Sequence, residues 1–394
     1  MKSLLDYSFE GRNILVRVDF NVPLDENFNI TDHSRITAAL PTIKKLLDDN
    51  ARVILMSHLG RPKGKDYKFS LQHIIDYLQK TLKTAVSFSE DCIGNLAKNK
   101  ARNIKNGEIL LLENLRFYKE EKQGDINFAK QLSELADVYV NDAFGTAHRS
   151  HASTSIIASF FPNEKYFGLL LKDEIDNLEK ALSKPKKPFT AIIGGAKISG
   201  KIDVVVSLLN KVDNLIIGGG MAYTFSKAMG GNIGNSLVED DKLELAKSII
   251  EKANKLDVNL LLPVDSVNAN DFNNNADIKN SDITSVQVGY MGLDIGEKSI
   301  QLFSEVIENS KTIIWNGPMG VFEMSNFENG TKNIGAAICR STNRGAFSLI
   351  GGGDSVAAIK KFEMEGRVSY ISTGGGAMLE YLEGKELPAI KAIL

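Results

Sequence analysis

The chain has 394 residues, 43% of them hydrophobic and 24% charged, a length and composition that predict roughly two or three globular domains and exclude a disordered chain. With 47 basic against 49 acidic residues and a net charge of -2, it lacks the large basic field that binds nucleic acid or anionic membranes. Its two cysteines, Cys92 and Cys339, stand far apart, which excludes a disulfide framework and a zinc cluster.

The N-terminal segment does not have the pattern of a signal peptide. Asp6 and Glu10 interrupt its apolar stretch before an export signal could form. No apolar run reaches the roughly 20 residues that cross a bilayer. We therefore expect a cytoplasmic protein without a membrane partner.

Short β-branched or leucine-rich runs recur along the chain, and each is followed by glycine or polar residues and then by helical periodicity. This order is typical of strand-helix repeats with parallel sheets. In the first half the predicted strands cover residues 14–20, 52–57, 109–113 and 138–141. We expect them to form one sheet.

Cations and hydrogen-bond donors follow these early strands, where parallel sheets bind ligands. Arginine forks match phosphate and carboxylate oxygens, so the set predicts a small, multiply charged anionic ligand. A single exposed arginine is usually only solvated, but several in equivalent positions favour a site. The set comprises Asp19, Asn21, Arg35, His58, Arg61, Arg116, His148, Arg149 and His151.

The remaining histidine patterns have simpler interpretations. His148 and His151 have i, i+3 spacing and could share a metal, but no third ligand stands near them in the sequence. Hydrogen bonding to an anion or a structural role is the favoured interpretation for this pair. His33 and His73 have no supporting context, and we expect them to be solvated.

Residues 168–183 carry Leu171, Ile175, Leu178 and Leu182 at helical spacing. The pattern ends at Pro185, which cannot continue a helix. Periodicity alone is equally compatible with a helix that connects two domains and with a surface helix inside one domain.

Glycines, and no histidines, follow the predicted strands of the second half, at 189–193, 214–217, 259–262, 312–315, 347–350 and 368–371. Glycine allows close approach of a ligand, and the following helix directs free N–H groups at phosphate. These glycines predict the nucleotide side of the protein and are Gly194, Gly195, Gly218, Gly219, Gly220, Gly317, Gly351, Gly352, Gly353, Gly374, Gly375 and Gly376.

Residues 195–202 have the GxxxxGK spacing of a P-loop, but Ile202 stands where a hydroxyl normally holds magnesium. A true P-loop is disfavoured, although Lys197 and Lys201, four apart on one expected helical face, could both reach phosphates. No GxGxxG motif follows a strand, so the fingerprint of a dinucleotide-binding fold is also missing.

Two carboxylates in the second half have alternative roles. Asp354 follows a glycine triplet and could hold Mg²⁺ on a nucleotide or cap a helix, and we favour the metal. Glu323 could bind ribose hydroxyls or remain a surface charge.

Motifs along nearly the whole chain resemble the phosphoglycerate kinase family. In chain order they are VDFNVP from Val18, SHLGRPKG from Ser57, ENLRF from Glu113, DAFGTAHRSHAST from Asp142, GGAKISGK from Gly194, GGGMA from Gly218, GYMGLDIG from Gly289, WNGPMGVFE from Trp315, GGGDS from Gly351 and STGGGAMLEYLEGKELPAI from Ser372. Small departures, Gly200 where Asp is common and Ala389 where Gly is common, touch no proposed catalytic group.

The resemblance implies the following site roles. Phosphoglycerate is bound by Asp19, Asn21, Arg35, His58, Arg61, Arg116 and Arg149. Transfer is catalysed by Arg35, Lys197, Lys201 and Gly375. The nucleotide is bound by Gly195, Lys201, Gly219, Gly292, Pro318, Glu323, Gly351, Gly352, Gly353, Asp354 and Ser355, with Mg²⁺ on Asp354.

The resemblance also implies an α/β fold of two doubly wound, Rossmann-like parallel-sheet domains joined by a hinge helix. The expected bounds are 1–167, with the tail 380–394 packed back on it, for the phosphoglycerate-binding domain, 168–183 for the helix and 184–379 for the nucleotide-binding domain. The implied partners are 3-phosphoglycerate, 1,3-bisphosphoglycerate, ATP and ADP, and the implied oligomeric state is a monomer.

Two other protein classes are disfavoured. A nicotinamide-dependent oxidoreductase would need the missing glycine fingerprint and would not need the arginines of the first half. A hinged anion-binding protein without catalysis is usually exported, and this sequence lacks an export signal.

Overall fold

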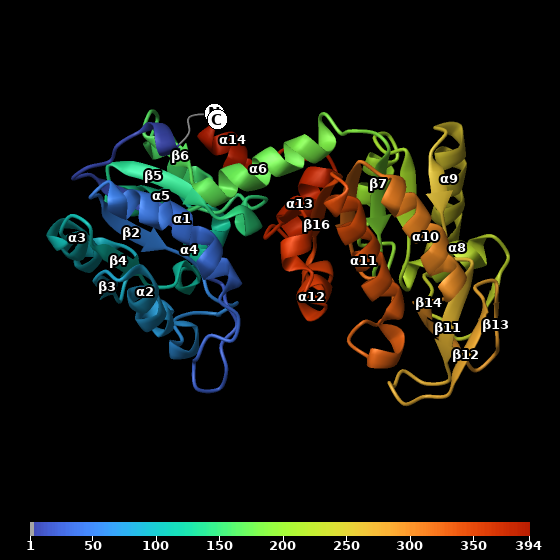
Figure 1. Cartoon of the computed structure of the whole chain (residues 1–394). Coiled ribbons are helices and arrows are strands. Elements are labelled where there is room, and N and C mark those ends of the chain that lie inside the picture. The colour runs from blue at the N-terminus through green and yellow to red at the C-terminus, as the bar shows by residue number, and fades with distance from the viewer. Residues whose placement is uncertain (1–3) are drawn as a thin grey trace. The chain divides into compact units, whose positions relative to one another are not determined.

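The structure is a computed structural model that describes residues 4–394. It divides into two compact units. The first extends to Ile175 and also contains Glu386–Leu394, and the second comprises Asp176–Lys385. Helix α6 (Leu169–Leu182) spans the boundary (Figure 1), so the predicted helix connects two units. The boundary lies within α6, and the chain returns to the first unit at Glu386.

The first unit is built on a six-stranded sheet in which every neighbouring pair is parallel. Its order is β3-β4-β2-β1-β5-β6, with β1 (Asn13–Val18), β2 (Arg52–Met56), β3 (Val86–Ser89), β4 (Ile109–Leu112), β5 (Val138–Asp142) and β6 (Lys165–Phe167). The four predicted strands are confirmed. The edge strands β3 and β6 were not predicted, because they are short and carry polar residues.

Helices bury both faces of this sheet. Ile36 and Ile43 of α1 share one core with Val16 and Leu55 of the sheet. Strand residues that alternate with these, such as Ile54, belong to the other face of the sheet and are equally buried. Burial on both faces explains why the strands read as continuous apolar runs. The helices are α1 (Ser34–Asp48), α2 (Ile75–Leu82), α3 (Gly94–Asn103), α4 (Lys119–Gln123), α5 (Ile126–Ser133) and, from the end of the chain, α14 (Pro388–Ile393).

The end of the chain completes the first unit. Helix α14 lies beside β6 (Figure 1). Its Ala389 N–H donates to the carbonyl of Ala147 at 3.0 Å, and Lys165 Nζ donates to the carbonyl of Ala392 at 2.6 Å. The last residues therefore support the segment that follows β5.

The second unit contains another six-stranded parallel sheet. Its order is β10-β8-β7-β15-β16-β17, with β7 (Phe189–Ile193), β8 (Asn214–Ile217), β10 (Asn259–Leu261), β15 (Thr312–Asn316), β16 (Phe347–Gly351) and β17 (Tyr370–Ile371). Each was predicted to within a few residues. The mixed α/β fold with two parallel sheets is thus confirmed.

Helices α10, α11 and α12 share the main core of this unit with the sheet. Trp315 and Ile313 of β15 pack in one cluster with Phe303, Ile338 and Ile359, because each of the three helices buries one face against the sheet. The helices are α7 (Ile202–Leu208), α8 (Met221–Ala228), α9 (Leu243–Lys255), α10 (Glu297–Asn309), α11 (Asn329–Asn343), α12 (Gly353–Lys361) and α13 (Gly376–Leu382).

A small antiparallel sheet in the second unit was not predicted. Its order is β12-β11-β14, with β11 (Asp265–Ala269), β12 (Ile278–Asp282) and β14 (Met291–Ile295), and a two-stranded piece pairs β9 (Asn232–Ile233) with β13 (Ser285–Val286). Strand β12 is largely exposed, and β11 shifts register at Val267. Strand β11 also buries the polar residues Ser266 and Asn268, so neither strand shows the apolar-polar alternation in its sequence by which a strand is recognised.

Among residues 4–394, no helix combines the length and the apolar character that crossing a membrane requires.

Replacing Leu55 by alanine in β2 should lower the free energy of unfolding of the first unit by about 2–5 kcal/mol, because the side chain is fully buried between strands and helices. Urea denaturation followed by circular dichroism measures the loss. Leu96→Ala in α3, at a side chain 45% exposed, is the matched control and should change stability little. Equal losses for both variants would contradict this account of the core.

Candidate functional site

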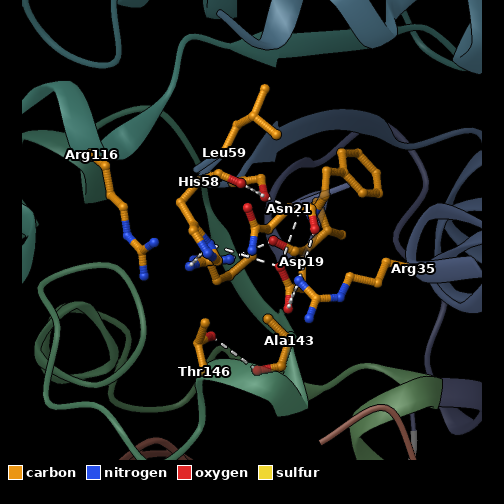
Figure 2. Close-up of polar contacts among 12 residues, drawn as sticks. Asp19, Asn21, Arg35, His58, Leu59, Arg116, Ala143 and Thr146 are labelled. Atoms are coloured by element: carbon orange, nitrogen blue, oxygen red, sulfur yellow. Dashed lines mark hydrogen bonds and ion pairs between the residues drawn. The ribbon is translucent and has the colours of Figure 1, made fainter. Parts of the chain in front are cut away.

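Charged and polar side chains from four elements meet at the carboxyl edge of the first sheet. Asp19 and Asn21 follow β1, His58 follows β2, Arg116 lies in the 3₁₀ helix Leu115–Phe117 after β4, and Arg35 lies on α1. Strands β1, β2 and β4 are neighbours, so their ends bring these residues together. Figure 2 shows Arg35 and Arg116 on opposite sides of Asp19, Asn21 and His58.

Hydrogen bonds hold the loops of this cluster in place. Arg35 Nη1 donates to the carbonyl of Asn21 at 2.8 Å and lies 3.6 Å from Asp19 Oδ2. Asn21 Oδ1 accepts from the N–H of Gly60 at 2.8 Å, and Arg116 Nη1 donates to the carbonyl of Gly60 at 2.7 Å. Each arginine thus uses part of its fork on the protein and keeps other donors for a ligand.

The cluster has an excess of positive charge. Burial, followed by the nearby Arg17, lowers the pKa of Arg116. His58 is 3% exposed, and burial, followed by Arg17, Arg116 and Arg35, lowers the pKa of its imidazole well below the ordinary value. His58 is therefore neutral at pH 7, and the arginines supply the charge that attracts an anion.

Arg61 and Arg149 are exposed. Arg61 lines a groove of about 700 Å³ together with Arg116 and Lys119. Arg149 has its backbone fixed, since its N–H donates to the carbonyl of Thr146 at 3.0 Å and its carbonyl accepts from Thr154 Oγ1 at 2.8 Å. Both guanidinium groups therefore lie at the solvent side of the first unit.

His148 and His151 lie near Arg149 in the sequence, and neither belongs to a described cluster that could hold a metal ion. His151 Nδ1 lies 3.8 Å from Glu121 Oε1, and burial, then Arg17, lowers the pKa of His151 to about 4. Within residues 4–394, no group of three His, Cys, Asp or Glu side chains is placed to hold a metal ion.

The exposed surroundings expected for His33 and His73 are only partly found. His33 is exposed but stacks on Tyr77, with ring centroids 4.2 Å apart. His73 stacks on Phe28 at 4.3 Å, and its Nε2 lies 2.7 Å from the carbonyl of Tyr67. His73 is half-buried rather than fully solvated, because Phe28 and Tyr67 pack on its ring.

The second unit has a cavity of about 440 Å³ at the carboxyl edge of its sheet. Six residues assigned to the nucleotide from sequence line it, namely Gly195, Gly219, Gly292, Pro318, Glu323 and Asp354. Sequence reasoning missed its apolar walls, which include Leu237, Phe272, Met291, Leu293 and Val321. Several of these come from β14 and from the connection after β11, where no strand had been predicted.

Two glycines of the cavity are required by close approach. A Cβ on Gly292 would lie 1.7 Å from Tyr223 Oη. Gly219 has φ +69, and a Cβ there would lie 2.6 Å from the backbone of Gly195. Any larger residue at either position would push the walls of the cavity apart.

Lys201 precedes α7 and donates through Nζ to the carbonyls of Gly194 at 2.6 Å and Asn316 at 3.0 Å. Burial lowers the pKa of its ammonium group to about 8, against the opposing charge of Asp354. Lys197 is exposed in an irregular turn. The prediction that both lysines share one helical face was wrong, because α7 begins only at Ile202.

The turn after β16 leads directly into α12. Gly352, at φ +90, is the N-cap of this helix and makes no side-chain cap bond. The alternative that Asp354 caps α12 was therefore wrong. Asp354 is an exposed residue of the first turn, while Ser355 is buried, and its hydroxyl accepts from the N–H of Gly317 at 2.5 Å.

Gly351, Gly353 and Gly375 occupy different surroundings. A Cβ on Gly351 would lie 1.8 Å from Met378 Sδ, so this position needs glycine for packing. Gly353 and Gly375 face open space, and Gly375, at φ +50, precedes α13. Both therefore leave room for a ligand at the first turn of a helix.

Comparison with known proteins gives a single family. The family model described as phosphoglycerate kinase matches residues 4–385. The chain is 51% identical to the phosphoglycerate kinase of Porphyromonas gingivalis, covering 98% of each sequence. It is also 51% identical to phosphoglycerate kinase 3, cytosolic, of Arabidopsis thaliana, covering 99% of this chain and 97% of that protein.

A solved structure leads to the same family. The phosphoglycerate kinase of Coxiella burnetii is 39% identical and superimposes with a TM-score of 0.90, covering 99% of this chain and 98% of that one.

The lowered pKa of Lys201 predicts that ATP binds less tightly as the pH rises. Below about pH 8 its Nζ carries a positive charge that attracts phosphate, and above it the charge is lost. We expect affinity to fall about tenfold between pH 7 and pH 9.5, measured by isothermal titration calorimetry. Lys201→Met should bind weakly at every pH, and a wild-type affinity that stays constant over this range would contradict the assignment.

Proposed function

Since the chain belongs to the phosphoglycerate kinase family, it is a phosphotransferase with a carboxyl group as acceptor, and we propose which of its residues perform the reaction. The reaction is the reversible transfer of a phosphoryl group between 1,3-bisphosphoglycerate and ADP, which yields 3-phosphoglycerate and ATP in glycolysis.

The cationic cluster of the first unit binds the phosphoglycerate in this proposal. The observation that carries it is the convergence of Arg35, Arg116 and a neutral His58 at the carboxyl ends of adjacent strands. Forked guanidinium groups suit the phosphate and carboxylate of such a ligand. Asp19 and Asn21 orient the glycerate and the arginines, and Arg61 and Arg149 approach from the solvent side.

The cavity of the second unit binds the nucleotide. Its volume of about 440 Å³ and its apolar walls suit an adenosine group, with Gly195, Gly219, Gly292 and Pro318 against the base and Glu323 on the ribose. The phosphates lie toward Lys197, Lys201 and the turn of Gly351, Gly352, Gly353 and Ser355, at the positive end of α12.

Asp354 would hold Mg²⁺ together with phosphate oxygens of the nucleotide. It is exposed, lines the same cavity and is not the N-cap of α12, so its carboxylate is accessible to an ion that needs only one or two protein carboxylates. When bound, the ion neutralises charge on the phosphates.

Catalysis in this proposal consists of positioning and charge stabilisation. The carboxylate acceptor is already ionised at neutral pH, so no general base is needed. Arg35, Lys197, Lys201 and the backbone around Gly375 at the start of α13 offset the negative charge on the phosphoryl oxygens during transfer. The lowered pKa of Lys201 indicates a group that has lost water and can interact strongly with a phosphate.

We further propose that the protein is a monomer of the cytoplasm that binds no nucleic acid. The near-neutral charge of -2 supports the absence of nucleic-acid binding, and the cytosolic Arabidopsis relative supports the location.

Replacing Arg35 by alanine should lower kcat by about 100-fold or more, because the transferred group loses one charged donor. The affinity for ATP should stay within twofold, since Arg35 belongs to the first unit. A coupled assay of ATP formation from 1,3-bisphosphoglycerate measures the change. Arg102→Ala, at an exposed arginine of α3, should keep full activity, and an Arg35→Ala enzyme of equal activity would refute the assigned role.

The groups assigned to the two substrates belong to different units, so transfer requires a closed state formed by bending near α6. We expect the radius of gyration from small-angle X-ray scattering to fall only when 3-phosphoglycerate and ATP are both present. Each ligand alone serves as the control. An unchanged radius with both bound would rule out closure.

A further inference from the structure

Arg17 is a buried cation directly behind the phosphoglycerate cluster. It lies on β1 and is 1% exposed. Its Nε donates to Ser153 Oγ at 3.0 Å, one Nη donates to the carbonyl of Val18, and the other lies 3.3 Å from His58 Nδ1. The guanidinium therefore has partners on three sides and is shielded from solvent.

The contact with Arg17 determines which ring nitrogen of His58 carries the proton. Guanidinium N–H groups can only donate, so Nδ1 of His58 must accept and the neutral ring carries its proton on Nε2. Asp19 Oδ1 lies 3.8 Å from the same Nδ1, and Arg116, Arg35 and His151 are the other charged or titratable groups around the ring. The neutral ring thus offers a single N–H donor, through Nε2.

Glu121 is linked to the buried charge through a bridging hydroxyl. Burial raises the pKa of its carboxyl, and the nearby Arg17 and the hydrogen bonds from Ser153 oppose that rise. It lies on α4 and is fully buried. Its Oε1 accepts from Ser153 Oγ at 2.6 Å and its Oε2 accepts from the N–H of Ser153 at 3.0 Å. Ser153 Oγ accepts from Arg17 at the same time, so Arg17, Ser153 and Glu121 form one connected relay.

Hydrogen bonds from β5 and α4, together with the bond from the Ser153 N–H to Glu121, hold the backbone that carries Arg149. The carbonyl of Ser153 accepts from Tyr139 Oη at 2.8 Å, and the carbonyl of Thr154 accepts from Asn141 Nδ2 at 3.1 Å. The N–H of Ala152 donates to the carbonyl of Glu121 at 2.9 Å. Segment 149–154 is therefore tied to β5 and α4 immediately beside the cluster.

Stability alone is a weak explanation for this arrangement. Buried ionic groups are expensive to desolvate, and well-packed hydrophobic residues of similar volume often serve as well or better. Arg17 also adds a cation beneath a site that already contains several arginines. A role in binding accounts for the position of both charges.

We propose that Arg17, Ser153 and Glu121 are positioning residues that keep His58 as a neutral Nε2–H donor and hold the Arg149 segment ready for the phosphoglycerate. The relay acts on the first unit only and rests on the proposed function for its ligand. It predicts one spectroscopic effect that is independent of catalysis and one selective kinetic effect.

Long-range ¹H–¹⁵N NMR of the imidazoles in the full chain tests the tautomer. In the wild type, His58, assigned by loss of its signals in His58→Gln, should show an unprotonated Nδ1 and a protonated Nε2 from pH 5.5 to 8.5. In Arg17→Met the ring should become a mixture of tautomers or titrate within that range. A wild-type Nδ1–H tautomer, or a ring unchanged in the variant, would overturn the proposal.

Ser153→Ala provides the second variant if Arg17→Met does not fold, with folding checked by circular dichroism. It keeps Arg17 but removes the hydroxyl that accepts from Nε and donates to Glu121 Oε1, while the N–H of Ser153 still donates to Oε2. We expect the His58 signals to shift in the same direction as in Arg17→Met. His58 signals identical to those of the wild type in a folded Ser153→Ala protein would count against the relay.

Steady-state kinetics test whether loss of the relay raises KM for 3-phosphoglycerate without raising KM for ATP. Glu121→Gln and Ser153→Ala should each raise KM for 3-phosphoglycerate about tenfold or more, while KM for ATP stays within twofold. Glu134→Gln, the same change at an exposed glutamate paired with Lys98 in the first unit, should alter neither. Unchanged or equally raised KM values for both substrates would overturn the proposal. A wild type without kinase activity would refute the proposed function instead, and the NMR experiment would still decide the relay.

Discussion

Parallel strand order is the constraint on which both candidate sites depend. In each unit the strands run in one direction, so their carboxyl ends share one edge and the loops that follow them are neighbours. Asp19, His58 and Arg116 are distant in sequence, yet β1, β2 and β4 place them together. The glycine turns after β7, β15 and β16 meet in the same way.

The two sites differ in how much formal charge they carry. The first unit collects cations and tolerates them because hydrogen bonds to carbonyls and the buried carboxylate of Glu121 offset part of the charge. His58 contributes no charge of its own, since burial and its arginine neighbours keep it neutral. The second unit uses little formal charge. There the backbone of glycine turns, the starts of helices and the partly dehydrated Lys201 face the place where phosphates would lie.

Packing then determines the shape of the second site. Gly292 lies against Tyr223, Gly219 lies against Gly195, and the side chains of Leu237 and Phe272 close the remaining walls. The antiparallel sheet of β11, β12 and β14 supplies part of this surface. Its residues are needed for the shape of the cavity rather than for chemistry, which is why they form no motif of reactive side chains.

The sequence by itself determined the two parallel sheets, the helix between the units and nearly every polar residue at the strand ends, because apolar runs, glycine turns and clustered arginines are local patterns. Only the tertiary structure decided that Lys197 lies outside any helix, that Gly352 rather than Asp354 caps α12, and that Leu237 and Phe272 line the cavity. It also revealed Arg17, Ser153 and Glu121 as one relay, which no sequence spacing indicates. The cavity walls and the relay depend on contacts between residues far apart in the chain, and periodicity and composition carry no information about such contacts.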